Sequence, residues 1–158
     1  MQAPCDASRG AGPPPFRTVI GAARDAVIVT DARLDRPGPS ILYVNPAFTR
    51  MTGYAPDEVV GRTPRLLQGP DSDRSEIGRM RETLLAGALY HGQSVNHRKG
   101  GETYVVDGLI APVHGADGAI VSWLAIQRDV TAERVAGERL RRGAAALEQR
   151  VRAVLASV

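Results

Sequence analysis

The sequence predicts an α+β protein with the architecture of a single five-stranded antiparallel sheet, short helices on one face and a long C-terminal amphipathic helix. Two observations lead to this prediction. Short runs rich in β-branched residues occur before residue 45, and three longer strand-like runs, separated by glycine turns, fill residues 90–129. The segments between these two groups carry helix signals, an order typical of a sheet whose helices lie on one side.

The N-terminal part predicts a leader followed by a β-hairpin. Residues 1–15 have the proline and glycine content of a disordered leader, and residues 16–24 are expected to form a short helical lead-in. DAVIVTD at residues 25–31 and SILYVN at residues 40–45 are strand-like and flank the turn sequence DRPGPS. We therefore expect these two runs to pair as a hairpin.

Several short helices are expected after the hairpin. Asn45 and Pro46 have the residue types of an N-cap and a first helical position, and Gly53 ends the segment that they open. A further turn begins at Pro56, and Asp73 is expected to cap a longer helix. The apolar face of that longer helix is predicted to be core, from the helical spacing of Ile77, Met80, Arg81, Leu84, Leu85 and Leu89.

The second half of the chain predicts three consecutive antiparallel strands. They are expected at residues 90–98, 102–113 and 119–129. The turns between them are Lys99–Gly101 and Gly115–Gly118, where glycine permits the tight backbone of a hairpin connection.

A C-terminal helix is predicted over residues 131–158. Small and apolar residues recur in it at alternating spacings of three and four, at Gly137, Leu140, Ala144, Leu147, Val151, Val154 and Val158. This pattern favours a coiled coil and hence a homodimer. The alternative is one amphipathic helix folded back on its own sheet, since the same stripe would serve either arrangement.

Composition limits the other possibilities. With 158 residues the chain suits one domain with tails, its one cysteine, Cys5, excludes an internal disulfide, and it has no apolar run long enough to span a membrane. The N-terminus does not resemble a secretory signal, so a cytoplasmic protein is expected. The net charge of +3 equals the excess of six arginines over three glutamates within residues 133–158. A charged helix without interleaved aromatic residues is typical of a solvated face, and nucleic-acid binding is not expected.

Four ordered motifs resemble the PAS domain family, and within it the light-oxygen-voltage (LOV) flavin-binding subfamily. GRTPRLLQGPDSDR at Gly61–Arg74 is similar to the family signature GRNCRFLQGPxTDR. NPAFTRMTGY at Asn45–Tyr54, NHRKGG at Asn96–Gly101 and AIQRDVT at Ala125–Thr131 also match in order and spacing. The resemblance spans about residues 26–131 and implies a PAS/LOV domain over residues 16–130, followed by a signalling helix at 131–158.

The resemblance implies a cavity for a flavin between the sheet and the helices. Arg65 and Arg81 match the arginines that hold the flavin phosphate, a role that the guanidinium fork suits. Gln68 matches a residue beside the ribityl chain, Asn96 a ring-edge asparagine, and Gln127 the glutamine that faces flavin N5 and O4. The complete set of expected cofactor-binding positions is Thr30, Asn45, Thr63, Pro64, Arg65, Leu67, Gln68, Met80, Arg81, Asn96, Val106, Ala125 and Gln127.

Three positions depart from the LOV pattern. Pro64 stands where the family keeps its adduct-forming cysteine, and a pyrrolidine ring has no nucleophile. Thr63 replaces an asparagine of the motif, and Val106 stands where a second ring-edge asparagine is expected. The thiol photocycle is therefore impossible at Pro64, and the loss of polar partners is expected to weaken flavin binding by roughly ten- to a hundredfold.

These observations lead to a hypothesis of non-covalent flavin binding and light sensing. The expected ligand is flavin mononucleotide (FMN) or another flavin, which blue light excites and an aromatic residue (Trp123, Tyr104 or Tyr90) then reduces. The amide of Gln127 would reorient and shift the strand that leads into the helix at Thr131, and so act on an unknown downstream signalling protein. The alternatives are a dark redox- or ligand-sensing module with weak or no flavin binding, and a dimerisation adaptor whose cavity is filled by its own side chains.

The chain is not expected to be an enzyme. No plausible nucleophile accompanies its histidines, they are not spaced like a metal set, and no glycine-rich loop precedes a helix in the form of a phosphate cradle. The three histidines are His91, His97 and His114.

Overall fold

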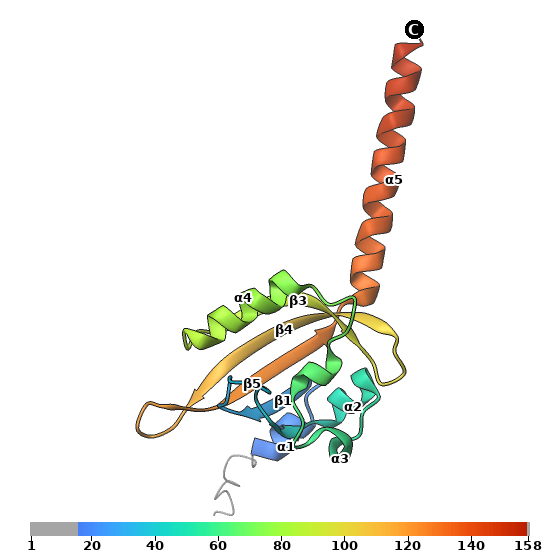
Figure 1. Ribbon diagram of the computed structural model, residues 1–158. Helices are drawn as coiled ribbons and strands as arrows, with labels where there is room; N and C mark the ends of the chain where they lie inside the picture. Colours follow the sequence, from blue (N-terminus) through green and yellow to red (C-terminus); the bar gives the residue numbers. More distant parts are fainter. Residues whose placement is uncertain (1–15, 158) are drawn as a thin grey trace, which may run out of the picture.

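A single five-stranded antiparallel sheet forms the centre of the computed structural model, which describes residues 16–157 (Figure 1). The strands are β1 Ala26–Asp31, β2 Ile41–Val44, β3 Tyr90–His97, β4 Thr103–His114 and β5 Ile120–Asp129. Their order across the sheet is β2-β1-β5-β4-β3, so β1 and β5, the first and last strands in sequence, lie side by side in the middle. The predicted α+β class is confirmed.

Short helices lie on one face of this sheet. They are α2 Pro46–Thr52, α3 Pro56–Val59, the 3₁₀ turn η1 Pro64–Leu67 and α4 Arg74–Leu85. The helix α1 Phe16–Gly21 lies elsewhere, because its Arg17 stacks over Tyr43, which points to the face opposite Ile28. In Figure 1, α4 crosses above β3 and β4, while α2 and α3 lie near β1 at the other end of the sheet. The main apolar core lies between β1, β2 and the short helices, and includes Ile28, Ile41, Phe48, Val59 and Leu67.

The helix boundaries follow from local chemistry. Asn45 caps α2 by accepting a hydrogen bond from the backbone N–H of Phe48, and Pro46 occupies the first turn. Gly53 ends α2 in the left-handed conformation, with φ of 81°, which glycine adopts without a steric penalty. Asp73 caps α4 through Ser75 N–H and Glu76 N–H. These caps agree with the predicted helix starts.

The predicted apolar face of α4 is wrong at its C-terminal end. The helix ends at Leu85, and both Leu85 and Leu89 are more than half exposed rather than core. Gly87, with φ of 69°, turns the chain away from the helix, and Ala88 N–H bonds back to Thr83 O. Apolar residues therefore continue at helical spacing in the sequence beyond Leu85, where the helix itself ends.

The C-terminal helix α5, Thr131–Ala156, extends away from the sheet (Figure 1). It has no buried residues, and its apolar side chains, including Leu140, Leu147 and Val154, are exposed. The alternative in which this helix folds back on its own sheet is therefore wrong. No described helix is both long enough and apolar enough to cross a membrane.

A polar cluster fixes the start of α5. The carboxylate of Asp129 accepts hydrogen bonds from Thr131 N at 3.0 Å and Thr131 Oγ1 at 2.6 Å, and it pairs with Arg98 at 2.6 Å. Thr131 Oγ1 also accepts a hydrogen bond from Val105 N on β4. The first turn of α5 is thus tied to the sheet, although the rest of the helix is not.

The expected disordered leader, Cys5 and the last stripe position, Val158, lie outside the described residues. The expected helical lead-in at residues 16–24 forms a helix only as far as Gly21.

Candidate ligand-binding cavity

A cavity of about 170 Å³ lies between the sheet and the segment that contains η1 and α4. Its floor comes from β1, β3, β4 and β5, and its roof from η1 and α4. Trp123, Ala125 and Gln127 line it together because alternate residues of a strand point to the same face. The segment between β1 and β2 adds Leu34 and Pro39 to the wall.

Most of the expected cofactor-binding residues meet at this cavity, although they come from distant parts of the chain. The ones that line it are Thr30, Thr63, Pro64, Arg65, Leu67, Gln68, Met80, Arg81, Asn96, Ala125 and Gln127. The cavity is therefore the place where any ligand held by these residues would lie.

Asn45 and Val106 are not among the residues that line the cavity. Asn45 is fully buried and accepts hydrogen bonds from Val27 N and Phe48 N while donating to Ile20 O and Asp25 O. All of its hydrogen-bonding groups are thus used within the fold, which gives it a structural role in this structure.

Val106 is also buried, with 2% of its surface exposed, and it pairs across the sheet with Ser94 and Asp129. Strand alternation places it on the same face as Ile110, which does line the cavity.

The turn η1 positions three neighbouring candidates. Thr63 precedes the turn, and its Oγ1 accepts a hydrogen bond from Arg65 N at 3.4 Å. Pro64 occupies the first turn position, where it offers the cavity only an apolar ring. Gly38, with φ of 115°, packs against this pair, since a Cβ there would lie 3.1 Å from Thr63 Oγ1 and 3.3 Å from Arg65 Nε.

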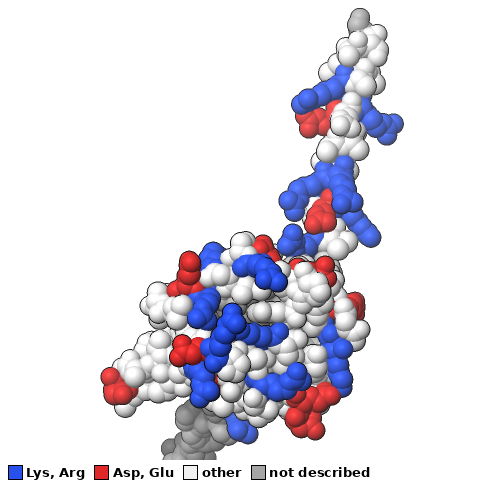
Figure 2. Space-filling model, in the orientation of Figure 1, with Lys and Arg blue, Asp and Glu red and all other residues white. Residues whose placement is uncertain are grey.

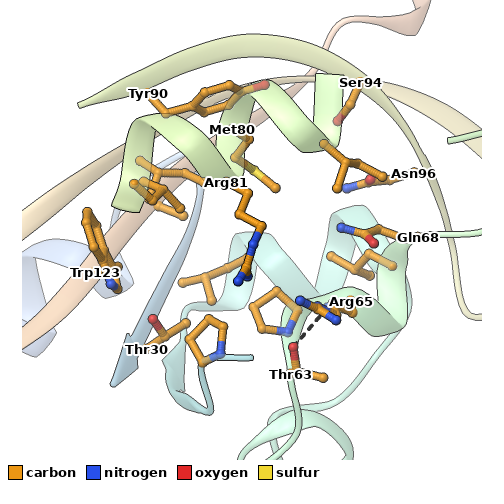
Figure 3. Close-up of a pocket in the computed structure, with 18 of the residues that line it drawn as sticks. Thr30, Thr63, Arg65, Gln68, Met80, Arg81, Tyr90, Ser94, Asn96 and Trp123 are labelled. Carbon is orange, nitrogen blue, oxygen red and sulfur yellow. Dashed lines mark hydrogen bonds between the residues drawn. The ribbon is translucent and has the colours of Figure 1, made fainter. Parts of the chain in front are cut away.

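The two candidate phosphate-holding arginines approach the cavity from different elements. Figure 3 shows Arg81 extending from α4 into the space above η1, with Arg65 beside Thr63. Arg81 donates a hydrogen bond to Leu34 O at 3.0 Å, which ties α4 to the segment between β1 and β2. On the visible face of the domain, basic and acidic side chains are interspersed, and basic ones predominate along α5 (Figure 2).

The amide side chains provide the directional polar groups of the cavity. Gln68 follows η1, Asn96 lies near the end of β3 and Gln127 lies near the end of β5. The Oε1 atom of Gln127 is buried and has no hydrogen-bond partner. A buried polar group left unpaired costs about 1–3 kcal/mol, and an amide can turn to present either its donor or its acceptor end, so Gln127 is suited to the polar edge of a ligand.

Sequence reasoning missed an acidic group in the cavity. Glu76 of α4 lines it, accepts a hydrogen bond from the phenol of Tyr90 at 2.5 Å and pairs with Arg79. The signal was present, because Glu76 lies one helical turn before Met80 on the same face of α4. Tyr90 was expected as a candidate electron donor, but its pairing with Glu76 was not.

The surroundings of Tyr90 and Glu76 change the pKa of both side chains. Burial and the adjacent Glu76 carboxylate raise the pKa of the Tyr90 phenol well above its usual range. Hydrogen bonds from Arg79 and Tyr90 lower the pKa of Glu76. At neutral pH the cluster therefore holds a neutral phenol beside a carboxylate.

Comparison with known proteins identifies the family. The sequence model of the PAS domain family matches residues 24–132 of this chain. The nitrogen fixation regulatory protein of Klebsiella oxytoca is 37% identical over 126 residues, which are 80% of this chain and 24% of that protein. The blue-light-activated histidine kinase of Brucella canis is 34% identical over 119 residues, which are 75% of this chain and 24% of that protein. The chain thus spans about a quarter of the length of these relatives.

Solved structures agree with this assignment. An RNA-binding light-oxygen-voltage receptor has a TM-score of 0.71 at 32% identity, over 84% of this chain and 36% of that one. A light-oxygen-voltage domain studied with a flavin analogue has a TM-score of 0.68 at 29% identity, over 82% of this chain and 93% of that one. The chain therefore belongs to the PAS domain family and matches light-oxygen-voltage domains within it.

Proposed function

We propose that this domain is a sensory module that binds flavin without a covalent bond and reports blue light through reduction of that flavin. The single observation that supports this most directly is the buried, unpaired Oε1 of Gln127 in the cavity. A flavin is an aromatic ring system with hydrogen-bond donors and acceptors along one edge, and it would supply light absorption and reversible electron uptake.

The residues present fit such a ligand. Gln127 and Asn96 each carry an amide that can donate and accept, as the polar edge of the ring requires. Arg65 and Arg81 suit a phosphate, so FMN is proposed rather than riboflavin.

Binding requires some rearrangement. The cavity of about 170 Å³ is smaller than the roughly 300–1,000 Å³ that is usual for small-molecule sites. Arg81 spans part of this space and is held there by Leu34 O. Release of that hydrogen bond would open the cavity and free the guanidinium for a phosphate.

The backbone leads directly from the cavity strand β5 into the helix α5. Gln127 lies two residues before Asp129, whose carboxylate caps α5 at Thr131. We propose that a change in the hydrogen bonding of the Gln127 amide shifts the end of β5 and alters this cap.

The output is proposed to pass through a homodimer. The exposed stripe on α5 includes Leu140, Leu147, Val151 and Val154, and a second copy of the helix would cover it. The domain itself is proposed to be regulatory rather than catalytic, because its relatives are much longer and one of them is a kinase. An unidentified downstream signalling protein remains part of the proposal, and no nucleic-acid partner is proposed.

A second candidate function is dark redox or ligand sensing. Pro64 offers no thiol to the cavity, and the chain is 37% identical over 126 residues to a nitrogen fixation regulatory protein. In this case the same cavity would bind its ligand without photochemistry.

The decisive experiment is the visible absorption spectrum of the purified protein with added FMN, before and after blue light, with an electron donor and without oxygen. We expect a structured flavin spectrum that blue light bleaches only when an electron donor is present. A spectrum unchanged by light would favour dark sensing, and a protein that takes up no FMN would contradict the flavin proposal.

The role of Gln127 is tested by Gln127→Leu. Loss of one hydrogen bond is expected to weaken FMN binding by roughly two- to tenfold and to abolish light-induced changes in hydrogen exchange at the start of α5. The matched control is Gln93→Leu, on an exposed position of β3. Equal behaviour of the two variants would contradict the proposed route.

A further inference from the structure

Two aromatic side chains line the cavity, and they donate hydrogen bonds to different kinds of acceptor. Tyr90 and Trp123 are both buried, at 4% and 3% exposure. Trp123 Nε1 donates to a backbone carbonyl, that of Ala32, at 3.4 Å. The Tyr90 hydroxyl donates instead to the carboxylate of Glu76 at 2.5 Å. Only the tyrosine therefore has a base next to its proton.

The Tyr90–Glu76 pair is held by its surroundings. Arg79 donates to both oxygens of Glu76, at 2.5 Å and 3.1 Å, and to His91 O at 2.8 Å. Gly92 leaves room for this arrangement, because a Cβ there would overlap the Glu76 carboxylate, the Tyr90 hydroxyl and the Arg79 guanidinium. The pair thus joins α4 to β3 at the wall of the cavity.

We propose that Tyr90 is the electron donor to the photoexcited flavin and that Glu76 accepts the tyrosine proton in the same event. This proposal rests on the flavin function proposed above. One electron leaves the Tyr90 ring for the flavin, the phenolic O–H bond breaks, and the proton moves to Glu76 Oε1. The chain is left with a neutral tyrosyl radical and a neutral carboxylic acid, and return of the electron and the proton restores the starting state.

The charges around the ring explain why the two transfers are coupled. The Arg79 guanidinium lies 4.8 Å from the centre of the Tyr90 ring. The Glu76 carboxylate lies nearer to the phenol than this charge does, at 2.5 Å from the hydroxyl. Loss of an electron makes the phenolic O–H far more acidic, so its proton moves to this carboxylate rather than leaving a positive ring beside Arg79. The raised pKa of Tyr90 keeps the phenol protonated in the dark, so the proton is available for transfer.

The other aromatic candidates lack this arrangement. Trp123 has no carboxylate at its N–H. Tyr104 is not among the residues that line the cavity, its hydroxyl is buried without a hydrogen-bond partner, and Arg98 lies 4.4 Å from its ring centre. No carboxylate is hydrogen-bonded to the Tyr104 hydroxyl, so it lacks the proton acceptor that Glu76 provides for Tyr90.

The test compares Tyr90→Phe and Glu76→Gln with Trp123→Phe, which removes the other aromatic side chain that lines the cavity, each loaded with FMN. The readouts are the fluorescence lifetime of the flavin in H₂O and in D₂O, and the electron paramagnetic resonance signal of a tyrosyl radical. We expect several-fold longer lifetimes in Tyr90→Phe and Glu76→Gln, no tyrosyl signal in Tyr90→Phe, and slower quenching of the wild type in D₂O. Trp123→Phe changes the cavity wall as well, but it should keep the tyrosyl signal and the slower quenching in D₂O.

A readout without flavin checks the pair itself. In alkaline ultraviolet titrations of the flavin-free protein, Glu76→Gln should lower the pKa of one tyrosine, and Tyr90→Phe should remove that transition. If Glu76→Gln unfolds, Gly92→Ala offers a second route, because the added Cβ separates Tyr90 from Glu76 without changing either residue; it should also lengthen the lifetime.

The possible outcomes separate this inference from the function on which it rests. Normal FMN uptake with a long lifetime in Trp123→Phe and an unchanged one in Tyr90→Phe would overturn the assignment of Tyr90. Unchanged lifetimes in Glu76→Gln and in D₂O would overturn the role of Glu76. Absence of FMN uptake by the wild type would overturn the proposed function and this inference together.

Discussion

Replacement of Asn45 by alanine tests whether this residue serves the fold or the ligand. Its side chain makes four hydrogen bonds, with Val27 N at 2.8 Å and with Phe48 N, Ile20 O and Asp25 O at 3.0 Å each. A net contribution of about 0.5–1.5 kcal/mol for each bond, including the helix cap, gives a predicted loss of about 2–6 kcal/mol for Asn45→Ala. That loss is a large part of the roughly 5–15 kcal/mol by which domains are stable.

The assay is urea unfolding of the flavin-free protein, followed by far-ultraviolet circular dichroism. With an m-value of about 2 kcal/mol/M, the predicted loss lowers the midpoint by about 2 M. Asn45→Ser is the graded variant, because serine can still cap α2 but is too short to reach Ile20 O and Asp25 O, and about half of the loss is expected. Compared with Asn45→Ala, Asn96→Ala in the cavity should lower the free energy of unfolding less and the affinity for FMN more.

The reasoning would be refuted if Asn45→Ala unfolded within 1 kcal/mol of the wild type, taken as about the size of a single hydrogen bond. It would also be refuted if Asn45→Ala folded normally but lost FMN binding, since Asn45 would then act on the ligand.

Three further predictions concern the start of α5, a close contact and the missing thiol. Burial raises the pKa of Asp129, but hydrogen bonds from Thr131 and Arg98 outweigh burial and lower the pKa below its usual 3.8. The Asp129 carboxylate should therefore hold the start of α5 above pH 3.8 and release it as the pH falls through the lower pKa of the folded state. The measurement is hydrogen exchange, which should become faster in the first turn of α5 in acid. Gly69→Ala should cost about 1–3 kcal/mol in thermal unfolding, because its Cβ would lie 2.5–2.8 Å from the His97 ring. Pro64→Cys should give the FMN-loaded protein a light-induced loss of visible absorption that recovers in the dark.

Each of these predictions has a matched control. Asp129→Ala should show at neutral pH the rapid exchange that the wild type shows only in acid, and equal exchange in both would contradict the capping role. Gly100→Ala adds a Cβ with no neighbour within 4 Å, so it should be harmless if the penalty at Gly69 is steric. Pro64→Ser lacks the thiol, and a similar light response in this variant would exclude a role for the new cysteine.

The sequence was sufficient for the elements that local chemistry decides. The alternation of β-branched residues, the glycine turns and the caps at Asn45 and Asp73 all act within a few residues of where they stand, so the strand segments and most helix starts followed from them. The motifs around Arg65 and Gln127, through their resemblance to light-oxygen-voltage domains, named residues that the fold brings to one cavity. The end of α4 was mispredicted because spacing continues in sequence after Gly87 has turned the backbone.

Tertiary structure alone decided what those side chains contact. The sequence placed Asn45 in the cofactor set, but folding turns it toward Val27, Ile20 and Asp25, where its groups are used. The α5 stripe was compatible with two arrangements, and only the path of the chain after Asp129 showed that the helix extends away from the sheet. A single-sequence pattern cannot distinguish such cases, because both arrangements bury the same stripe.

The pairing of Tyr90 with Glu76 shows the same limit in the cavity. The two residues are separated by fourteen positions, and their contact depends on how α4 lies across β3. The unpaired oxygen of Gln127 is also a property of its surroundings, because burial and the absence of a partner arise only when β5 is covered. The sequence thus determined which side chains could line the cavity. Packing determined which of their polar groups remain available to a ligand, because hydrogen bonds form between atoms that are close in space.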